Sequence, residues 1–219
     1  MSAVLDGPRF NPRSGAPQSL VVLLHGYGSN GDDLISLAPA FAERLPHTVF
    51  VSPHAPDPVP GAPGGRQWFP LARLSPDELA VGVVRAGPIL QRFLDQELTR
   101  YRLPPHRLAL VGFSQGTMMA LHAGLRRPDR IGGILGYSGA LAAPETLKAE
   151  LASKPPVQLI HGDADTVVPA QALFTAAHAL SEAGHGAMWS LRPGLPHGID
   201  PEGVALGGWF LSRALTGGF

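Results

Sequence analysis

The chain has 219 residues, of which 44% are hydrophobic, and this length suits one domain with a full core. Its 17 basic and 17 acidic residues cancel, and no basic stripe is present, which argues against a nucleic acid partner. The absence of cysteine excludes disulfides and a cysteine nucleophile. No apolar run approaches the ~20 residues of a membrane span, and residues 1–8 lack a signal-peptide pattern, so we expect a cytoplasmic protein.

Strand-like apolar runs alternate with helix-like segments along the chain. Strands are expected at 20–24, 49–51, 108–111, 131–135, 157–160 and 188–191, and helices at 32–45, 78–102, 117–126, 170–183 and 203–215. This alternation predicts an α/β fold with a mostly parallel central sheet and helices on both faces. We expect a single domain over 1–219, and no stretch is left over for a helical lid domain.

The turn after the first strand has two interpretations. Residues 26–31 read GYGSNG, which matches the G-x-G-x-x-G fingerprint of a dinucleotide site. A nicotinamide-dependent oxidoreductase would also need an acidic residue at the end of the next strand, and residues 48–53 contain none. The other interpretation is that small residues let the backbone approach a substrate, so that the Tyr27 N–H becomes an oxyanion donor.

A proline-rich segment, 53–70, interrupts the alternation. Its prolines fix φ and remove N–H donors, so we expect a long irregular loop. The loop leaves the end of a central strand, where α/β sheets bind ligands. We therefore expect Trp68 and Phe69 to form the wall of a substrate pocket, although they could instead pin the loop to the core.

The most informative motif is Gly112-Phe113-Ser114-Gln115-Gly116, between an apolar strand and a helical segment. Glycines on both sides of Ser114 allow a sharp strand-to-helix turn that exposes the serine hydroxyl, which is the arrangement of a nucleophile. The Gln115 N–H follows the nucleophile and is the other expected oxyanion donor. Met118 is expected to pack against the sheet or to reach the substrate pocket.

A serine nucleophile requires a base and an orienting acid, which follow it along the chain in the order acid, then histidine. His197 lies in a loop after the last expected strand and is the candidate base. An acidic turn after residues 157–160 offers Asp163 and Asp165, and the spacing alone does not decide between them. Asp165 could also cap the following helix.

These motifs resemble those of the phospholipase/carboxylesterase branch of the α/β-hydrolases, which includes acyl-protein thioesterases. The resemblance is carried by residues 24–28, 68–69, 112–116, 161–169 and 196–197. It implies an α/β-hydrolase fold and a serine carboxylesterase that forms an acyl-enzyme, with Ser114, Asp165 and His197 as catalytic triad. It also favours Asp165 over Asp163, because the family's acid is the second aspartate of the turn.

From the motifs and the resemblance together, we expect hydrolysis of soluble short- to medium-chain esters without a cofactor. A thioesterase or lysophospholipase of the same family is the alternative, and a catalytically dead binding protein is a third hypothesis. The nine histidines show no His-Glu-x-x-His pairing, so no metal site is predicted. The expected partner is a small-molecule ester, with a homodimer left open.

Overall fold

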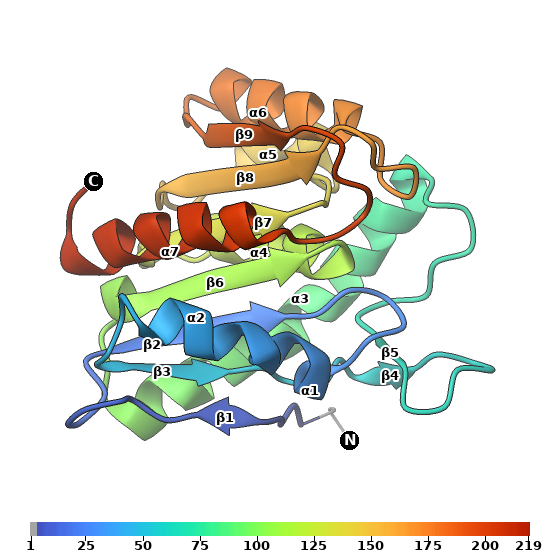
Figure 1. Ribbon diagram of the computed structural model, residues 1–219. Coiled ribbons are helices and arrows are strands. Elements are labelled where there is room, and N and C mark those ends of the chain that lie inside the picture. The colour runs from blue at the N-terminus through green and yellow to red at the C-terminus, as the bar shows by residue number, and fades with distance from the viewer. Residues whose placement is uncertain (1–3) are drawn as a thin grey trace.

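The computed structural model describes residues 4–219, which form a seven-stranded sheet in the order β1-β3-β2-β6-β7-β8-β9 (Figure 1). The strands are β1 (Arg9–Phe10), β2 (Ser19–Leu24), β3 (Thr48–Val51), β6 (Leu108–Phe113), β7 (Gly133–Tyr137), β8 (Val157–Gly162) and β9 (Met188–Arg192). Only β1 runs antiparallel to its neighbour, β3. The sheet is therefore mostly parallel, as the alternation of segments predicts.

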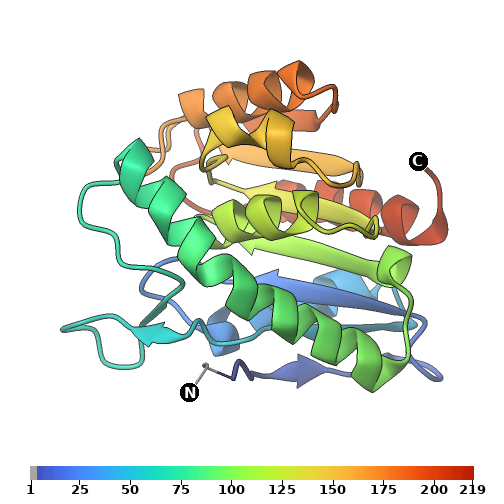
Figure 2. The ribbon, with the colours of Figure 1, turned by 180° about the vertical axis from the view of Figure 1, so that it is seen from behind.

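Helices cover both faces of this sheet. One face carries α1 (Gly31–Leu34), α2 (Ala38–Ala42) and α7 (Pro201–Thr216), in front in Figure 1. The other face carries α3 (Pro76–Tyr101), α4 (Gln115–Leu125), α5 (Pro144–Glu150) and α6 (Gln171–Glu182), in front in Figure 2. This arrangement is the α/β-hydrolase fold.

The central strands are apolar on both sides because both sides are covered. In β2, Leu20, Val22 and Leu24 pack into the core under α3 and α4, whereas Val21 and Leu23 pack into the core under α2 and α7. Successive side chains of a strand point to opposite faces, so one run of five apolar residues contributes to two cores.

Short elements were not expected from the sequence. The segment 53–70 contains a small antiparallel hairpin of β4 (Asp57–Pro58) and β5 (Arg66–Gln67), and α5 and β1 were likewise unexpected. Proline is tolerated in β4 because a two-stranded ribbon leaves one edge of each strand without a partner, where a missing N–H costs nothing. The prediction of a wholly irregular loop is therefore wrong at these positions.

The start of α3 also fixes the segment in front of it. Ser75 caps the helix, accepting the Glu78 N–H, and α3 begins at Pro76, two residues before the expected start. The Glu78 carboxylate accepts N–H groups from Ala72, Arg73 and Ser75. This capping box ties the segment 71–74 to the helix terminus.

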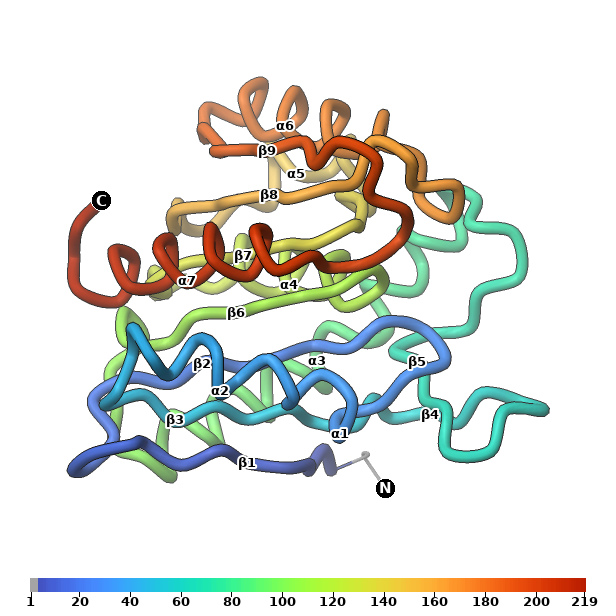
Figure 3. The backbone as a smooth tube through the Cα atoms, viewed as in Figure 1, coloured from blue at the N-terminus to red at the C-terminus, as the bar shows by residue number. Residues whose placement is uncertain are grey.

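The loops after β2, β6, β8 and β9 lie at the carboxyl end of the parallel strands, at the right in Figure 3. This is the edge of an α/β sheet at which ligands bind. Among the helices of residues 4–219, none combines the length and apolarity needed to span a membrane.

Candidate active site

Ser114 forms the turn between β6 and α4, with φ +54° and ψ −118°. A positive φ is unfavourable for a residue that carries a Cβ, so the serine backbone is strained. The flanking glycines make the turn possible, because a Cβ on Gly112 would collide with the backbone of Gly116, and one on Gly116 would collide with the carbonyl of Leu24. The structure thus places Ser114 on the sharp strand-to-helix turn that the motif predicts.

Asp165 lies in the turn after β8, and its side chain is fully buried. One carboxylate oxygen, Oδ1, accepts the N–H groups of Val167 and Val168, both at 2.9 Å. The other, Oδ2, lies 2.7 Å from Nδ1 of His197. Burial favours the neutral acid, but the hydrogen bonds from His197 and the two backbone N–H groups outweigh it and hold the pKa of Asp165 below its ordinary value. The carboxylate therefore stays ionised.

Asp163, the other candidate for the acid, does a different job. It is exposed, and its Oδ1 accepts the N–H of Gly194 at 2.6 Å. The contact joins the turn after β8 to the loop that carries His197. The structure thus places Asp165, and not Asp163, against the imidazole.

His197 lies between β9 and α7. Because a carboxylate only accepts hydrogen bonds, Nδ1 carries the proton in the contact with Asp165, which leaves Nε2 of the neutral ring as an acceptor. The ring packs on Phe113, with ring centroids 4.9 Å apart. Ser138, at the end of β7, donates its hydroxyl to the Gly198 carbonyl at 3.1 Å and so supports the histidine loop.

Ser114 and His197 line one cavity of about 450 Å³. Its walls are mostly apolar and include Met118, Tyr27, Leu71, Leu74, Val167 and Val168. Tyr27, Leu74 and Val167 are also among the large apolar side chains most open to solvent. The mouth of the cavity is therefore apolar. Met118 lines the cavity with a buried side chain, and Tyr27, expected only as an oxyanion donor, lines it as well.

The two expected oxyanion donors are placed by backbone contacts. A Cβ on Gly26 would lie 3.2 Å from Cβ of Ser114, so the turn after β2 passes directly over the serine. Gly28 donates its N–H to the Arg66 carbonyl at 2.9 Å. This hydrogen bond holds the backbone that follows Tyr27. Gln115 is the first residue of α4, and an N–H at this position has no acceptor within the helix.

Trp68 and Phe69 do not line this cavity, contrary to the expectation that they wall the substrate pocket. Both are buried: the Trp68 indole donates to the His25 carbonyl at 2.9 Å, and the Phe69 ring occupies the space beside Gly82 of α3. The Gln115 side chain accepts the Trp68 N–H at 2.9 Å and donates to the Phe69 carbonyl at 2.8 Å. The pair anchors the loop to the core.

Sequence reasoning gave His25 no role, although the residue directly precedes the glycine turn. It is fully buried, its Nε2 accepts the Ala55 N–H at 3.0 Å, and its Nδ1 lies 2.8 Å from the Gly26 carbonyl. An acceptor role for Nε2 leaves the proton on Nδ1, where it donates to that carbonyl. Burial lowers the pKa of His25 to about 4, which keeps the ring neutral.

The glycine turn at 26–31 is used differently from a dinucleotide site. A pyrophosphate site needs the amino end of a crossover helix, but the turn lies against Ser114 and leads into α1, a helix of four residues. Among residues 4–219, no cluster of three or more His, Asp or Glu side chains has the geometry of a metal site.

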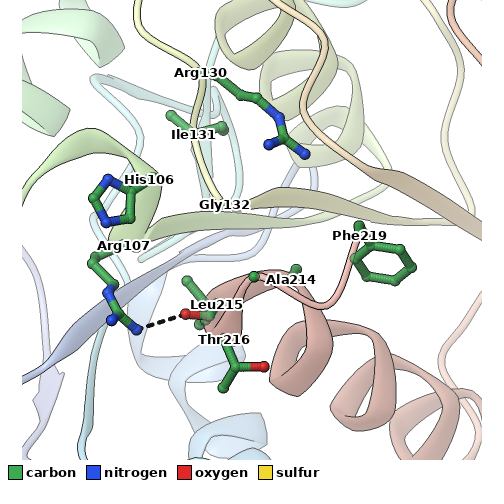
Figure 4. A pocket seen from close by; sticks show the side chains of 10 residues that line it. His106, Arg107, Arg130, Ile131, Gly132, Ala214, Leu215, Thr216 and Phe219 are labelled. Carbon is green, nitrogen blue, oxygen red and sulfur yellow. Dashed lines mark hydrogen bonds between the residues drawn. The ribbon is translucent and has the colours of Figure 1, made fainter.

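A second cavity, of about 370 Å³, lies at the opposite, amino-terminal edge of the sheet (Figure 4). Figure 4 shows Arg107 and Arg130 in its wall, with Phe219 on the side away from Arg107. Each guanidinium donates to a carbonyl: Arg107 to Leu215 at 2.7 Å, near the end of α7, and Arg130 to Lys154 at 3.1 Å. None of the predicted site residues lines this cavity.

Comparison with known proteins agrees with this geometry. A family model described as Phospholipase/Carboxylesterase matches residues 6–213. The crystal structure of esterase PE8 is 44% identical, with a TM-score of 0.93, and the match covers 97% of this chain and 100% of that one. Acyl-protein thioesterase 1 of Gibberella zeae is 29% identical over 92% of this chain and 93% of its own length. Esterase YpfH of Escherichia coli is 30% identical over 84% and 77%, respectively.

The family match spans almost the whole chain, including the serine turn, the acidic turn after β8 and the histidine loop. The fold, sheet order and strained serine described above are consistent with it. The chain belongs to the phospholipase/carboxylesterase family and is a serine hydrolase with the α/β-hydrolase fold.

Proposed function

We propose that the protein is a carboxylesterase that hydrolyses soluble short- to medium-chain carboxylic esters, with Ser114 as nucleophile, His197 as base and Asp165 as orienting acid. The observation that carries the proposal is the contact of 2.7 Å between Asp165 and His197, at a cavity that His197 shares with the strained Ser114. A buried carboxylate, an oriented imidazole and a serine on one cavity can perform acyl transfer.

In the first half of the reaction, Nε2 of His197 takes the hydroxyl proton as Ser114 attacks the ester carbonyl. The C–O bond to the alcohol then breaks, and His197 returns the proton to the departing alkoxide, which leaves an acyl-serine. Water attacks this ester with the same base, releasing the carboxylic acid and restoring the serine. Asp165 stays ionised throughout, because its pKa is lowered.

The negative oxygen of each tetrahedral intermediate needs donors that are already in position. We assign this role to the N–H groups of Tyr27 and Gln115. Both lie beside Ser114, one in the turn over its Cβ and one as the next residue of the chain. His25 supports the first donor by fixing the Gly26 carbonyl.

The cavity supports an apolar acyl or alcohol group of limited size. A volume of about 450 Å³ and a wall of Leu71, Met118, Val167 and Val168 suit a short to medium alkyl chain. The wall nearest α3 is the segment 71–74, which the Glu78 carboxylate holds in place. No step of surface-induced opening is expected, so turnover should saturate normally with soluble ester.

A thioesterase is the alternative that the comparisons favour, because a relative over almost the full length is named acyl-protein thioesterase 1. The same triad would attack a thioester carbonyl and release a thiol. Comparing matched acetyl and octanoyl oxygen esters and thioesters would separate the two, with the carboxylesterase showing the higher kcat/KM on the oxygen esters.

A fluorophosphonate probe tests the nucleophile directly. We expect labelling of Ser114, located by peptide mass spectrometry, and loss of esterase activity in parallel. A p-nitrophenyl ester series of rising chain length then gives the substrate class, with kcat/KM highest at short to medium chains. Absence of labelling in folded protein, or a jump in rate only on emulsified long-chain ester, would contradict the proposal.

The pH dependence of the rate tests the base. His197 must be neutral to accept the serine proton, and Asp165 is already ionised, so kcat/KM should rise with pH in a single step. A flat profile from pH 5 to 9, with the chemical step rate-limiting, would exclude a histidine base.

A further inference from the structure

A second histidine lies against the carboxylate of Asp165. His161 occupies the end of β8, and its side chain is only 2% exposed. Its Nε2 lies 2.8 Å from the Val168 carbonyl and 3.3 Å from Oδ2 of Asp165. Oδ2 is the oxygen that accepts the hydrogen bond of His197.

The surroundings of His161 define which ring nitrogen carries the proton. The Val168 carbonyl can only accept, so the short contact requires a proton on Nε2. The same N–H is close enough to Oδ2 of Asp165 to be shared between the two acceptors. Three hydrogen bonds reach the carboxylate, from the N–H groups of Val167, Val168 and His197, and Nε2 of His161 lies beside them at 3.3 Å from Oδ2.

His161, Val168 and Asp165 each contact the other two. Val168 donates its N–H to Asp165, and its carbonyl accepts the Nε2–H of His161, so this histidine holds the residue that binds the acid and lies beside the acid itself. These contacts link the end of β8 to the turn 163–170. A carboxylate with donors on both oxygens cannot rotate without losing several hydrogen bonds at once.

We propose that His161 is a positioning residue for the hydrolysis: its Nε2–H fixes Oδ2 of Asp165 so that this oxygen meets Nδ1 of His197 in the productive orientation. The inference rests on the proposed function of the triad. His161 does not line the cavity of Ser114, so it acts on the rate and not on substrate binding. It transfers no proton to the substrate.

Four variants test the role in the full-length protein. His161→Leu fills space without a donor, His161→Gln places an amide N–H near the position of Nε2, and His161→Asn places one too close to the backbone to reach Asp165. His185→Leu is the matched control, because His185 is also buried but lies at the other edge of the sheet, just ahead of β9.

We expect His161→Leu and His161→Asn to lower kcat on a p-nitrophenyl ester by about tenfold, with KM changed by less than twofold, because a weak hydrogen bond to a charged group is lost. His161→Gln should recover most of the rate. The downfield proton resonance of the hydrogen bond between His197 and Asp165 should move in the Leu and Asn variants and stay near its position in the Gln variant. His185→Leu should leave kcat and the resonance unchanged.

Equal kcat in the Gln and Asn variants would overturn the proposal, as would a wild-type rate in His161→Leu with an unmoved resonance. If His161→Leu does not fold, the comparison of Gln with Asn still decides. Failure of the proposed function looks different: the wild-type protein would then not be labelled by fluorophosphonate at Ser114.

Discussion

The two edges of the sheet each carry a cavity of similar volume, about 450 Å³ at the carboxyl end of the strands and about 370 Å³ at the amino end. The carboxyl edge holds a strained serine, a fully buried carboxylate and an imidazole bound to it. At the amino edge, Arg107 and Arg130 donate to backbone carbonyls. Among the residues that line this cavity, none other than glycine has a positive φ.

Cavity volume therefore does not distinguish the two edges, but the backbone strain and the buried charge at the carboxyl edge do. A positive φ at a serine and a buried charge both oppose folding, and the surrounding structure must compensate for them. At the amino edge, the Arg107 guanidinium satisfies a carbonyl near the end of α7, which is ordinary stabilisation of a helix terminus. The strained serine and the buried carboxylate therefore point to chemistry at the carboxyl-terminal edge, whereas the contacts at the amino-terminal edge serve to stabilise the fold.

The largest expected effect is on the nucleophile. Ser114→Ala should lower kcat on a p-nitrophenyl ester by roughly 10⁴- to 10⁶-fold, because the triad acts as a unit, while the oxyanion donors leave a residual rate. Arg107→Ala is the matched control at the other edge and should keep the wild-type kcat while losing about 1 kcal/mol of stability. Near-normal turnover in Ser114→Ala would break the comparison.

The next effect separates the two aspartates of the turn after β8. Asp165→Asn should lower kcat by roughly 10³- to 10⁴-fold, because an amide no longer fixes the tautomer of His197. Asp163→Asn keeps the oxygen that accepts the Gly194 N–H, so its kcat should fall less than threefold. Steady-state kinetics on both variants measure this, and the reverse order would move the acid to Asp163.

A substitution at Trp68 tests whether this side chain belongs to the substrate pocket or to the core. Replacing this buried indole with alanine should destabilise the fold by about 3 to 5 kcal/mol, or lower Tm by roughly 10 °C, and leave the ranking of ester chain lengths unchanged. Trp189→Ala, at a half-exposed side chain on β9, should shift Tm far less. A normal Tm with an inverted chain-length ranking would instead return Trp68 to the substrate pocket.

The last expected effect concerns stability in acid. Burial lowers the pKa values of His25 and His122 to about 4. The unfolded chain takes up their protons below about pH 6.5, so stability is complete above that pH and falls as the pH drops toward 4, by on the order of 3 kcal/mol per histidine. Tm should decline from pH 7 to 4.5 in the wild type and less steeply in His122→Leu. A constant Tm over this range would contradict both pKa shifts.

The sequence was sufficient for the fold, and it proposed a serine and a histidine that the structure brings to one cavity. Strand-like apolar segments that alternate with helix-like segments predict the sheet and its helices. The glycines around Ser114 are explained by the sharp turn, because a Cβ on either one would collide with neighbouring backbone. The choice of Asp165 over Asp163 needed the resemblance, because two aspartates two residues apart on one turn look alike until the loop folds.

The contacts that hold the site in place could not be predicted. His161 and Ser138 each lie at a strand end and bind a backbone carbonyl far along the chain or across a turn, and such partners have no sequence signal. Trp68 is expected in the pocket because its loop leaves the end of a central strand, but the sequence equally allows the role of a core anchor. In the folded protein its backbone N–H donates to the Gln115 side chain and its indole N–H to the His25 carbonyl, and neither contact has a sequence signal.

The Gln115 side chain has a further consequence for redesign. It joins the loop of Trp68 and Phe69 to the first turn of α4 through two hydrogen bonds, while its own N–H lies next to Ser114. The loop and the turn at Ser114 are therefore joined directly through one side chain. A loop grafted from a relative will keep the serine in register only if it presents an N–H and a carbonyl to the same amide, so the exchangeable module of this enzyme begins after Phe69, in the segment 71–74 that lines the cavity.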